Sequence, residues 1–168
     1  LRQPNLLGRI HQLLHEHHLQ PDLLQLEITE NFIMSQAEEA LTVLHQLKNL
    51  GVQLAIDDFG TGYSSLSYLK RLPLDILKID QSFVRGLPDD PHDVAIVRAI
   101  IALGRSMQFT IIAEGVETLA QQQFLTEEGC EQIQGYIVSL PLCAEEFAAT
   151  FLRVTVSDFS DSTAEKPS

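Results

Sequence analysis

The chain has 168 residues, of which 45% are hydrophobic, and it carries a formal net charge of −12. That length and composition suit one domain with a hydrophobic core. The negative charge argues against broad binding to nucleic acid polymers, because phosphate backbones are held by clustered Lys and Arg. Neither a signal peptide nor an apolar run of about 18 residues is present, so we expect a cytoplasmic protein without membrane insertion. Its start at Leu1 is compatible with a piece of a longer protein.

Strand-like apolar runs alternate with helical patterns along the chain. The runs predict strands at 24–29, 52–57, 75–80, 110–114 and 131–137. Apolar residues at helical spacing predict helices at 35–51, 93–104, 118–129 and 144–152. Strands that alternate with helices pair in parallel through right-handed crossovers, which predicts an α/β layer or barrel.

The helix boundaries follow from capping residues. Thr118 and Gln121 have the spacing of a capping box, and Gly129 suits the end of that helix. Asp93 is the expected N-cap of the preceding helix. The polar residues 154–168 are expected to form a flexible tail.

An apolar stripe marks the helix expected at 93–104, formed by Val94, Val97, Ile100 and Ile101. We expect the stripe to pack in the core rather than to form a groove for a partner. The neighbouring helices could also dimerise, and a homodimer is the expected assembly.

Cysteines and histidines give little sign of a metal or redox site. Cys130 and Cys143 match no zinc spacing and no disulfide framework, so reduced thiols are expected. His11, His15 and His18 share one helical face, but no thiol or carboxylate completes a zinc set. A solvated helix surface is the simpler interpretation of the three histidines.

Polar side chains recur near the C-terminal ends of the expected strands, at Glu27, Asp57, Lys78, Glu114 and Gln134. Their separations of 30, 21, 36 and 20 residues are the lengths of successive βα units. Because the carboxyl ends of parallel strands meet at one edge, these side chains are expected to converge on one site. Any one of these acids alone is better explained as a helix cap or as the partner of a Lys or Arg, and it is the set of five on consecutive units that favours a functional site.

Four of the candidates are carboxylates: Glu27, Asp57, Asp58 and Glu114. Two like charges about 4 Å apart repel by about 4 kcal/mol at an effective dielectric constant of 20, and Lys78 alone cannot neutralise four acids. Either the pKa values rise or divalent cations bind, and an all-oxygen set favours Mg²⁺ or Mn²⁺. Two such ions suit in-line displacement at phosphorus, which predicts phosphodiester hydrolysis.

The segments LEITEN, AIDDFGTGYSSLSYL, LKIDQSFV, IIAEGVET and QGYIVSLPL resemble, in order and spacing, the motifs of EAL-domain cyclic di-GMP phosphodiesterases. The resemblance implies a modified (β/α)8 TIM-type barrel, of which about five of the eight βα units lie in a partial EAL domain over residues 1–153. The implied activity is hydrolysis of cyclic di-GMP to linear pGpG with two Mg²⁺ or Mn²⁺ ions. The resemblance also implies that sensory or GGDEF domains precede this domain in the full-length protein. The domain could then be the cytoplasmic part of a membrane-anchored sensor.

The resemblance implies catalytic and metal-binding roles for five residues. Glu27, Asp57, Asp58 and Glu114 correspond to metal ligands, with Asp57 bridging the two ions. Lys78 corresponds to the lysine that holds the attacking water, and Glu114 to the glutamate assigned as general base. Asp57 and Asp58 count among the catalytic residues for the same reason.

Four further residues match the family's supporting positions. Gln134 and Asp80 correspond to residues near the substrate. Glu30 corresponds to an acid that steadies the loop after Asp58, and Glu117 to a second supporting acid.

Two parts of the family pattern have no counterpart in this sequence. The Glu-Ala-Leu strand, with its metal-binding glutamate and a phosphate-contacting arginine, is missing, as is the strand with the metal-binding asparagine of Asn-x-Ser. Leu140 also stands where the family commonly has a basic residue before Pro141. The residues at hand are therefore expected to be weakly active or inactive alone. The alternatives are a non-catalytic cyclic di-GMP receptor and a protein-interaction module.

Overall fold

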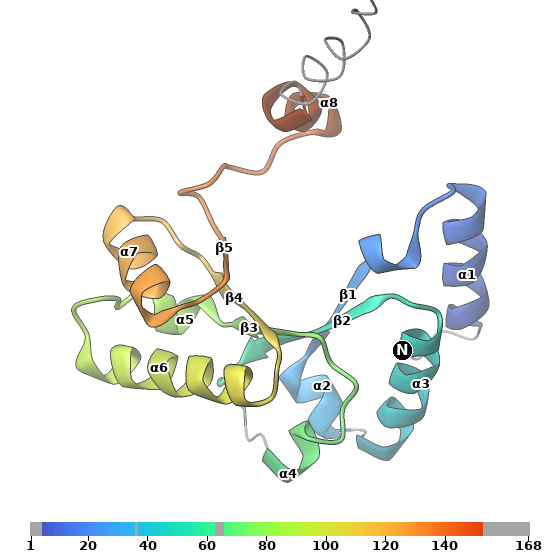
Figure 1. The fold of residues 1–168 in the computed structure, drawn as a ribbon, viewed down its shortest axis with the longest axis horizontal. Coiled ribbons are helices and arrows are strands. Elements are labelled where there is room, and N and C mark those ends of the chain that lie inside the picture. Colours follow the sequence, from blue (N-terminus) through green and yellow to red (C-terminus); the bar gives the residue numbers. More distant parts are fainter. Residues whose placement is uncertain (1–4, 36, 63–65, 153–168) are drawn as a thin grey trace, which may run out of the picture. The chain divides into compact units, whose positions relative to one another are not determined.

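A five-stranded parallel sheet organises the computed structural model, which describes residues 5–35, 37–62 and 66–152, without the side chains of 34, 35 and 37–39 (Figure 1). The strands lie side by side in chain order. They are β1 (Gln25–Thr29), β2 (Gln53–Phe59), β3 (Ile76–Ile79), β4 (Thr110–Glu114) and β5 (Gln132–Gln134). The predicted parallel pairing of five strands is confirmed.

The helices connect consecutive strands, as right-handed crossovers require. Two helical elements precede β1, α1 (Leu6–Glu16) and the 3₁₀ turn η1 (Pro21–Leu23). The connections between strands contain α2 (Glu30–Ser35), α3 (Ala37–Asn49), α4 (Leu66–Leu69), α5 (Gln81–Val84), α6 (Pro91–Ser106) and α7 (Leu119–Glu128). No helix in the described ranges has both the length and the apolar character that crossing a membrane demands.

The two faces of the sheet have different surroundings, because side chains alternate along a strand. Leu54, Leu77 and Ile111 belong to the main core that the sheet shares with the helices. The intervening residues Ala55 and Ile76 point to the opposite face, where they form a small buried cluster with Ile112. The functional candidates continue this second face toward the carboxyl ends of the strands.

Side-chain caps mark the starts of α5, α6 and α7, with one correction to the prediction. The capping box of Thr118 and Gln121 is confirmed, as is the terminating Gly129, whose φ of 78° suits glycine. The predicted N-cap Asp93 is wrong. Asp90 caps α6 by accepting hydrogen bonds from the backbone N–H groups of residues 92 and 93, and Pro91 occupies the first helical turn, where its missing N–H costs nothing.

Two compact units make up the chain, Leu1–Ile137 and Val138–Ser168. In the second unit, the helix expected at 144–152 divides into α8 (Ala144–Phe147) and a π-helical turn, η2 (Ala148–Leu152). The rings of Phe147 and Phe151 contact each other there, with centroids 5.0 Å apart. The tail expected at 154–168 lies outside the described residues.

Candidate active site

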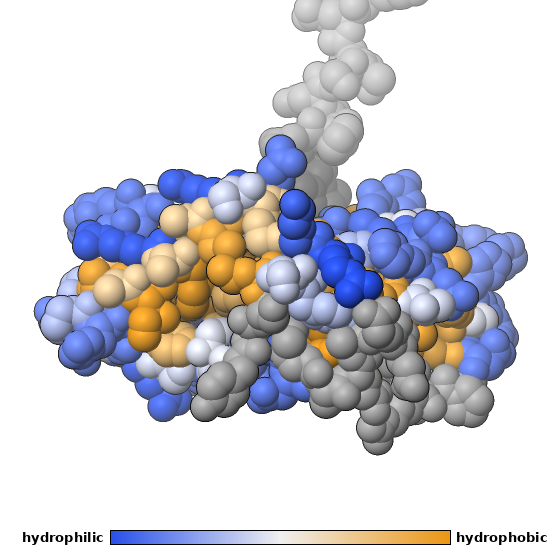
Figure 2. Space-filling view, turned by 90° about the horizontal axis from the view of Figure 1, so that it is seen from below, coloured by the Kyte–Doolittle hydropathy of each residue, from blue (hydrophilic) through white to orange (hydrophobic). Residues whose placement is uncertain are grey.

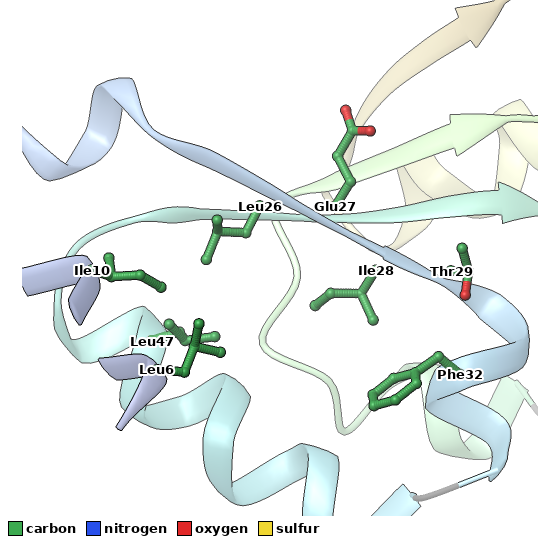
Figure 3. A pocket seen from close by; sticks show the side chains of 8 residues that line it. All are labelled: Leu6, Ile10, Leu26, Glu27, Ile28, Thr29, Phe32 and Leu47. Carbon is green, nitrogen blue, oxygen red and sulfur yellow. The ribbon is translucent and has the colours of Figure 1, made fainter. Parts of the chain in front are cut away.

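The acidic residue of β1 points away from the helices. In Figure 3, Leu26 and Ile28 turn toward Leu6, Ile10, Leu47 and Phe32, which line a pocket of about 370 Å³, whereas Glu27 points to the other side of the strand. The alternation expected for β1 is therefore present. It places Glu27 on the same side of the sheet as the polar residues of the next strands.

Lys78 on β3 is the centre of the site. Its Nζ lies 2.6 Å from Glu114 Oε1 on β4, 2.8 Å from Glu27 Oε2 on β1 and 3.2 Å from Asp57 Oδ1 on β2. The lysine side chain is 2% exposed, while those of Glu114 and Glu27 are 18% and 42% exposed. One buried ammonium thus holds carboxylates from three other strands together.

Burial and charge shift the pKa values of this group in opposite directions. Burial lowers the pKa of Lys78, but hydrogen bonds to Glu114 and Glu27 raise it by more, so the ammonium stays charged. Burial raises the pKa of Glu114 above its usual value, although the hydrogen bond and the charge of Lys78 lower it. Lys78 therefore compensates the acidic group only in part.

Asp57, Asp58 and Glu114 form the one group of described residues whose carboxylate oxygens are close enough to share a metal ion, with ligand atoms within 4.8 Å of one another. Asp57 Oδ1 is buried, and its ion-pair partner is the ammonium of Lys78 at 3.2 Å, which holds Glu27 and Glu114 at shorter distances. A buried oxygen held only by this longer, shared contact is incompletely satisfied, and a bound cation would satisfy it. This donor set fits a hard divalent ion.

The backbone explains how the adjacent residues Asp57 and Asp58 reach the same site. Strand β2 extends to Phe59 rather than ending at Asp57 as predicted, but its register with β3 shifts between Ile56 and Phe59. Asp58 also has a left-handed φ of 55°. The irregularity turns the second carboxylate toward the first. Burial raises the pKa of Asp58, and the charges of Asp57 and Asp80 raise it further.

Glu30 holds the turn that follows these two aspartates. It is fully buried at the start of α2, and its Oε2 accepts hydrogen bonds from Gly60 N at 2.9 Å and from Gly62 N at 3.4 Å. Gly60 has a φ of 101°, a conformation that favours glycine. The chain leaving Asp58 is thereby fixed to the end of β1.

The remaining candidates lie around the cluster. Asp80 follows β3, is 9% exposed and caps α5 by accepting a hydrogen bond from Ser82 N at 2.8 Å. Gln134 is exposed on β5, in register with Glu114 on β4. Glu117 is exposed in the loop after β4, outside the group of close carboxylates.

Sequence reasoning missed two structural carboxylates at the amino ends of the strands. Asp75 Oδ2 accepts hydrogen bonds from Leu54 N at 2.9 Å and from Lys48 Nζ at 2.6 Å. Glu131 Oε2 accepts one from Ile111 N at 2.6 Å. The available signal was an acid directly before the first residue of β3 and of β5, where it accepts a hydrogen bond from the start of the neighbouring strand.

An α/β fold with an acidic site at the carboxyl edge of its sheet is shared by many enzymes. Comparison with known proteins identifies the family to which this chain belongs. The EAL domain family model matches residues 1–141. The chain is 50% identical over 145 residues to the bifunctional diguanylate cyclase/cyclic di-GMP phosphodiesterase MucR of Pseudomonas aeruginosa. The aligned region covers 86% of this chain and 21% of MucR. It therefore spans about a fifth of the length of that relative.

Solved structures agree with the sequence match. The PaMucR phosphodiesterase in complex with c-di-GMP superposes with a TM-score of 0.84 at 49% identity, over 87% of this chain and 59% of that chain. Klebsiella pneumoniae BlrP1 in a manganese/cy-diGMP complex gives a TM-score of 0.75 at 34% identity, over 81% of this chain and 35% of that one. The chain belongs to the EAL domain family. The predicted fold class, a modified (β/α)8 TIM-type barrel of which about five units are present, is confirmed.

Proposed function

We propose that this domain hydrolyses cyclic di-GMP to linear pGpG. The observation that carries the proposal is the convergence of Glu27, Asp57 and Glu114 on the ammonium of Lys78 at the carboxyl edge of the sheet. The activity named for MucR and the c-di-GMP bound to PaMucR support the same substrate. A cytoplasmic location, with sensory or GGDEF domains upstream, belongs to this proposal.

Two Mg²⁺ or Mn²⁺ ions would be held by Glu27, Asp57, Asp58 and Glu114. The support is the all-oxygen donor set, the buried Asp57 oxygen that only the shared Lys78 ammonium contacts, and the manganese of the BlrP1 complex. Bound ions would activate water and neutralise charge on the phosphoryl oxygens. The Glu-Ala-Leu and Asn-x-Ser strands would add ligands, so residues 1–168 alone are expected to be weakly active or inactive.

The side chains of this chain would perform three tasks. Lys78 is a charged donor fixed by its neighbours, so it can orient the attacking water. Glu114 Oε1 accepts from Lys78, which places this carboxylate beside the water that Lys78 would hold, so it can take the proton of that water. Gln134 and Asp80 would contact the substrate, while Glu30 and Glu117 would support the loops around it.

The deciding experiment measures Mn²⁺-dependent hydrolysis of cyclic di-GMP by the chain extended upstream in its natural protein. Asp57→Asn is compared with Asp22→Asn, which changes an exposed acid of η1. Hydrolysis that Asp22→Asn retains and Asp57→Asn reduces by about 100-fold or more supports the proposal. Hydrolysis that persists in Asp57→Asn contradicts the role of Asp57. Binding of cyclic di-GMP without hydrolysis would instead identify a receptor. Absence of both binding and hydrolysis would identify an interaction module.

A further inference from the structure

Gln121 on α7 is one of four polar side chains that are buried within the described ranges. The other three, Glu30, Lys78 and Asp80, lie in or beside the candidate active site. Gln121 is 6% exposed. Of its side-chain hydrogen bonds, the capping box explains only the one that Oε1 accepts from Thr118 N at 3.0 Å. The remaining bonds reach residues outside α7 and need a separate explanation.

The side-chain amide of Gln121 connects two segments that are far apart in the sequence. Its Oε1 also accepts a hydrogen bond from Glu117 N at 2.8 Å, and its Nε2 donates one to Val84 O at 3.1 Å. The orientation of the amide follows from these partners, because a backbone N–H only donates and a carbonyl oxygen only accepts. Val84 is the fully buried last residue of α5. One amide thus ties the loop 115–118 to the end of α5.

Each tied segment begins directly after a residue of the candidate site. Helix α5 follows Asp80, and the loop 115–118 follows Glu114, the last residue of β4. The paired register of β3 and β4 ends at Ile79 and Ala113, one residue earlier on each strand. The sheet ladder between these two strands therefore stops short of both functional residues. Contacts between the following segments must fix how they lie relative to each other.

Close packing brings the start of α5 against the same loop. Gly115 has a φ of 68°, and a Cβ on this glycine would lie 2.6 Å from the Cβ of Gln81. The turn after the two aspartates is equally close, since a Cβ on Gly60 would lie 2.9 Å from Phe83 Cε2. Helix α5 therefore contacts both the turn that follows β2 and the loop that follows β4.

Helix α6 supports α5 through apolar contacts. Val97, Ile100 and Ile101 of α6 are buried, which confirms that most of the predicted stripe belongs to the core. Figure 2 shows hydrophobic side chains gathered over α6 on the outside of the molecule as well. Apolar packing thus holds α5 on α6, and the amide of Gln121 adds a directed polar tie from α7.

We propose that Gln121 is a positioning residue for the hydrolysis, a role that rests on the proposed function. By tying the loop 115–118 to α5, its amide holds Glu114 in place against Lys78. The Lys78 Nζ to Glu114 Oε1 distance is 2.6 Å, and a group that takes a proton from water must keep such a geometry in the reacting complex. Gln121 acts through the backbone of Glu117 and Val84 and does not touch the reacting groups.

The first test measures Mn²⁺-dependent hydrolysis of cyclic di-GMP by the chain extended upstream in its natural protein. Gln121→Leu removes the amide at nearly constant volume. The control Gln123→Leu makes the same change at an exposed position of α7, where it removes a hydrogen bond to Glu127. We expect Gln121→Leu to lower kcat by about 10- to 100-fold with KM within about threefold, because positioning of Glu114 matters in the chemical step.

Gln123→Leu should leave kcat and KM within about twofold of the parent values. Parental kcat in Gln121→Leu, or a change confined to KM, would overturn the positioning role while the proposed hydrolysis stands. An inactive parent chain would overturn the proposed hydrolysis and this role with it.

The second test separates the tie to α5 from the capping box. The carboxylate of Gln121→Glu still accepts from Glu117 N and Thr118 N but cannot donate to Val84 O. We expect this variant to lower kcat by about three- to tenfold. Because it keeps the cap, it decides the question even if Gln121→Leu does not fold. Parental kcat in Gln121→Glu would overturn the proposal.

Hydrogen exchange of the 168-residue chain checks the same tie without nucleotide. In Gln121→Glu, exchange of a peptide covering α5 should accelerate by about threefold, while a peptide covering Glu117 and Thr118 should exchange as in the parent chain. In Gln121→Leu both peptides should exchange faster. Exchange that is unchanged in α5 in both variants would contradict the tie to Val84 and overturn the proposal.

Discussion

Lys78 Nζ lies 2.6 Å from Glu114 Oε1, and the lysine side chain is 2% exposed. The same ammonium is within ion-pair distance of Glu27 and Asp57, so it connects β3 to three other strands. The carboxyl edge of the sheet therefore depends on one buried cation for charge balance and for side-chain position. Its removal would leave three carboxylates facing one another.

We expect Lys78→Met to lower the free energy of unfolding by about 3 kcal/mol, the lower end of the range for breaking a buried ion pair, because Glu27 is partly solvated. The matched control is Lys48→Met, which removes the partly exposed pair with Asp75 and should cost about 1 kcal/mol. Urea unfolding followed by circular dichroism measures both. If Lys78→Met were as stable as Lys48→Met, Lys78 would not hold the cluster together.

Divalent ions should stabilise the domain most at neutral and alkaline pH. The pKa values of Asp58 and Glu114 are raised by burial, so the metal-free fold gains stability below these pKa values and loses it as the pH rises through them. Mn²⁺ relieves the same repulsion and competes with protons for the same oxygens. At ten times its dissociation constant it should add about 1.4 kcal/mol.

Differential scanning fluorimetry near pH 7.5 and pH 5.5 checks this expectation. The Mn²⁺-induced rise in Tm should be larger at the higher pH, should vanish with EDTA and should be smaller in Asp57→Asn. Asp22→Asn, far from the group of close carboxylates in sequence, should behave like the parent chain. A rise in Tm that Asp57→Asn leaves unchanged would show that the ion binds elsewhere.

Loss of Glu30 should loosen the turn after Asp58. Glu30→Ala removes the acceptor of the Gly60 and Gly62 N–H groups from a fully buried position, whereas Glu30→Gln keeps one amide oxygen and should act more weakly. Hydrogen exchange of a peptide covering Gly60–Gly62 should accelerate by about tenfold in Glu30→Ala. Glu16→Ala, which removes an exposed hydrogen bond to Gln12, is the control. Unchanged exchange at these glycines would mean that other contacts fix the turn.

The convergence of the polar residues at the strand ends could be predicted from two regularities, the alternation of side chains along a strand and the parallel pairing of the strands. Alternation along each strand puts Asp57, Lys78 and Glu114 on one face, and parallel pairing brings their strand ends to one edge. The length of each βα unit then predicts convergence without coordinates. The burial of Lys78 and the distances from its ammonium to the three carboxylates could not be predicted in this way. That Lys78 is almost fully buried depends on how three side chains from other strands close over it.

The start of α6 and the end of β2 could not be predicted correctly, because both depend on contacts that no local sequence pattern reveals. The start of α6 was placed too late because the acids and prolines before it are equally typical of a loop, and only the hydrogen bonds of Asp90 identify the cap. The extension of β2 to Phe59 depends on the shifted register with β3 and on the left-handed Asp58, which Glu30 stabilises from another strand end. The left-handed conformation of a non-glycine residue is uncommon and is seldom predicted from sequence.

Gly135 should tolerate no side chain. A Cβ at this position would overlap the backbone oxygen and nitrogen of Val116, which form hydrogen bonds of 3.0 Å with Ile137 N and 3.1 Å with Gln134 O. Gly135→Ala must therefore separate the segment after β5 from the loop after β4, at a cost of about 1–3 kcal/mol. In Gly8→Ala, the new methyl group meets only the side chain of Asn5 and improves the helix propensity of α1. Urea midpoints should thus fall for Gly135→Ala and stay level for Gly8→Ala, and equal midpoints would contradict the close approach.

The two cysteines should differ strongly in reactivity. Burial raises the pKa of the Cys130 thiol to about 11, although hydrogen bonding of the sulfur to the backbone of Gln132 and Ala113 lowers it. Cys143 is exposed. The thiolate is the nucleophile. A raised pKa therefore means that a smaller fraction of Cys130 is in the reactive thiolate form at any pH below that value. Near pH 8 we expect iodoacetamide to alkylate Cys130 at least about tenfold more slowly than Cys143.

Mass spectrometry of peptides after timed quenching distinguishes the two sites. Cys143→Ser should retain only the slow phase and Cys130→Ser only the fast one. The slow phase should accelerate as the pH approaches about 11, because the thiolate population of Cys130 grows in proportion. In urea, which exposes both thiols, the two rates should converge. Equal rates in the folded chain would show that Cys130 is not shielded by its position between β4 and β5.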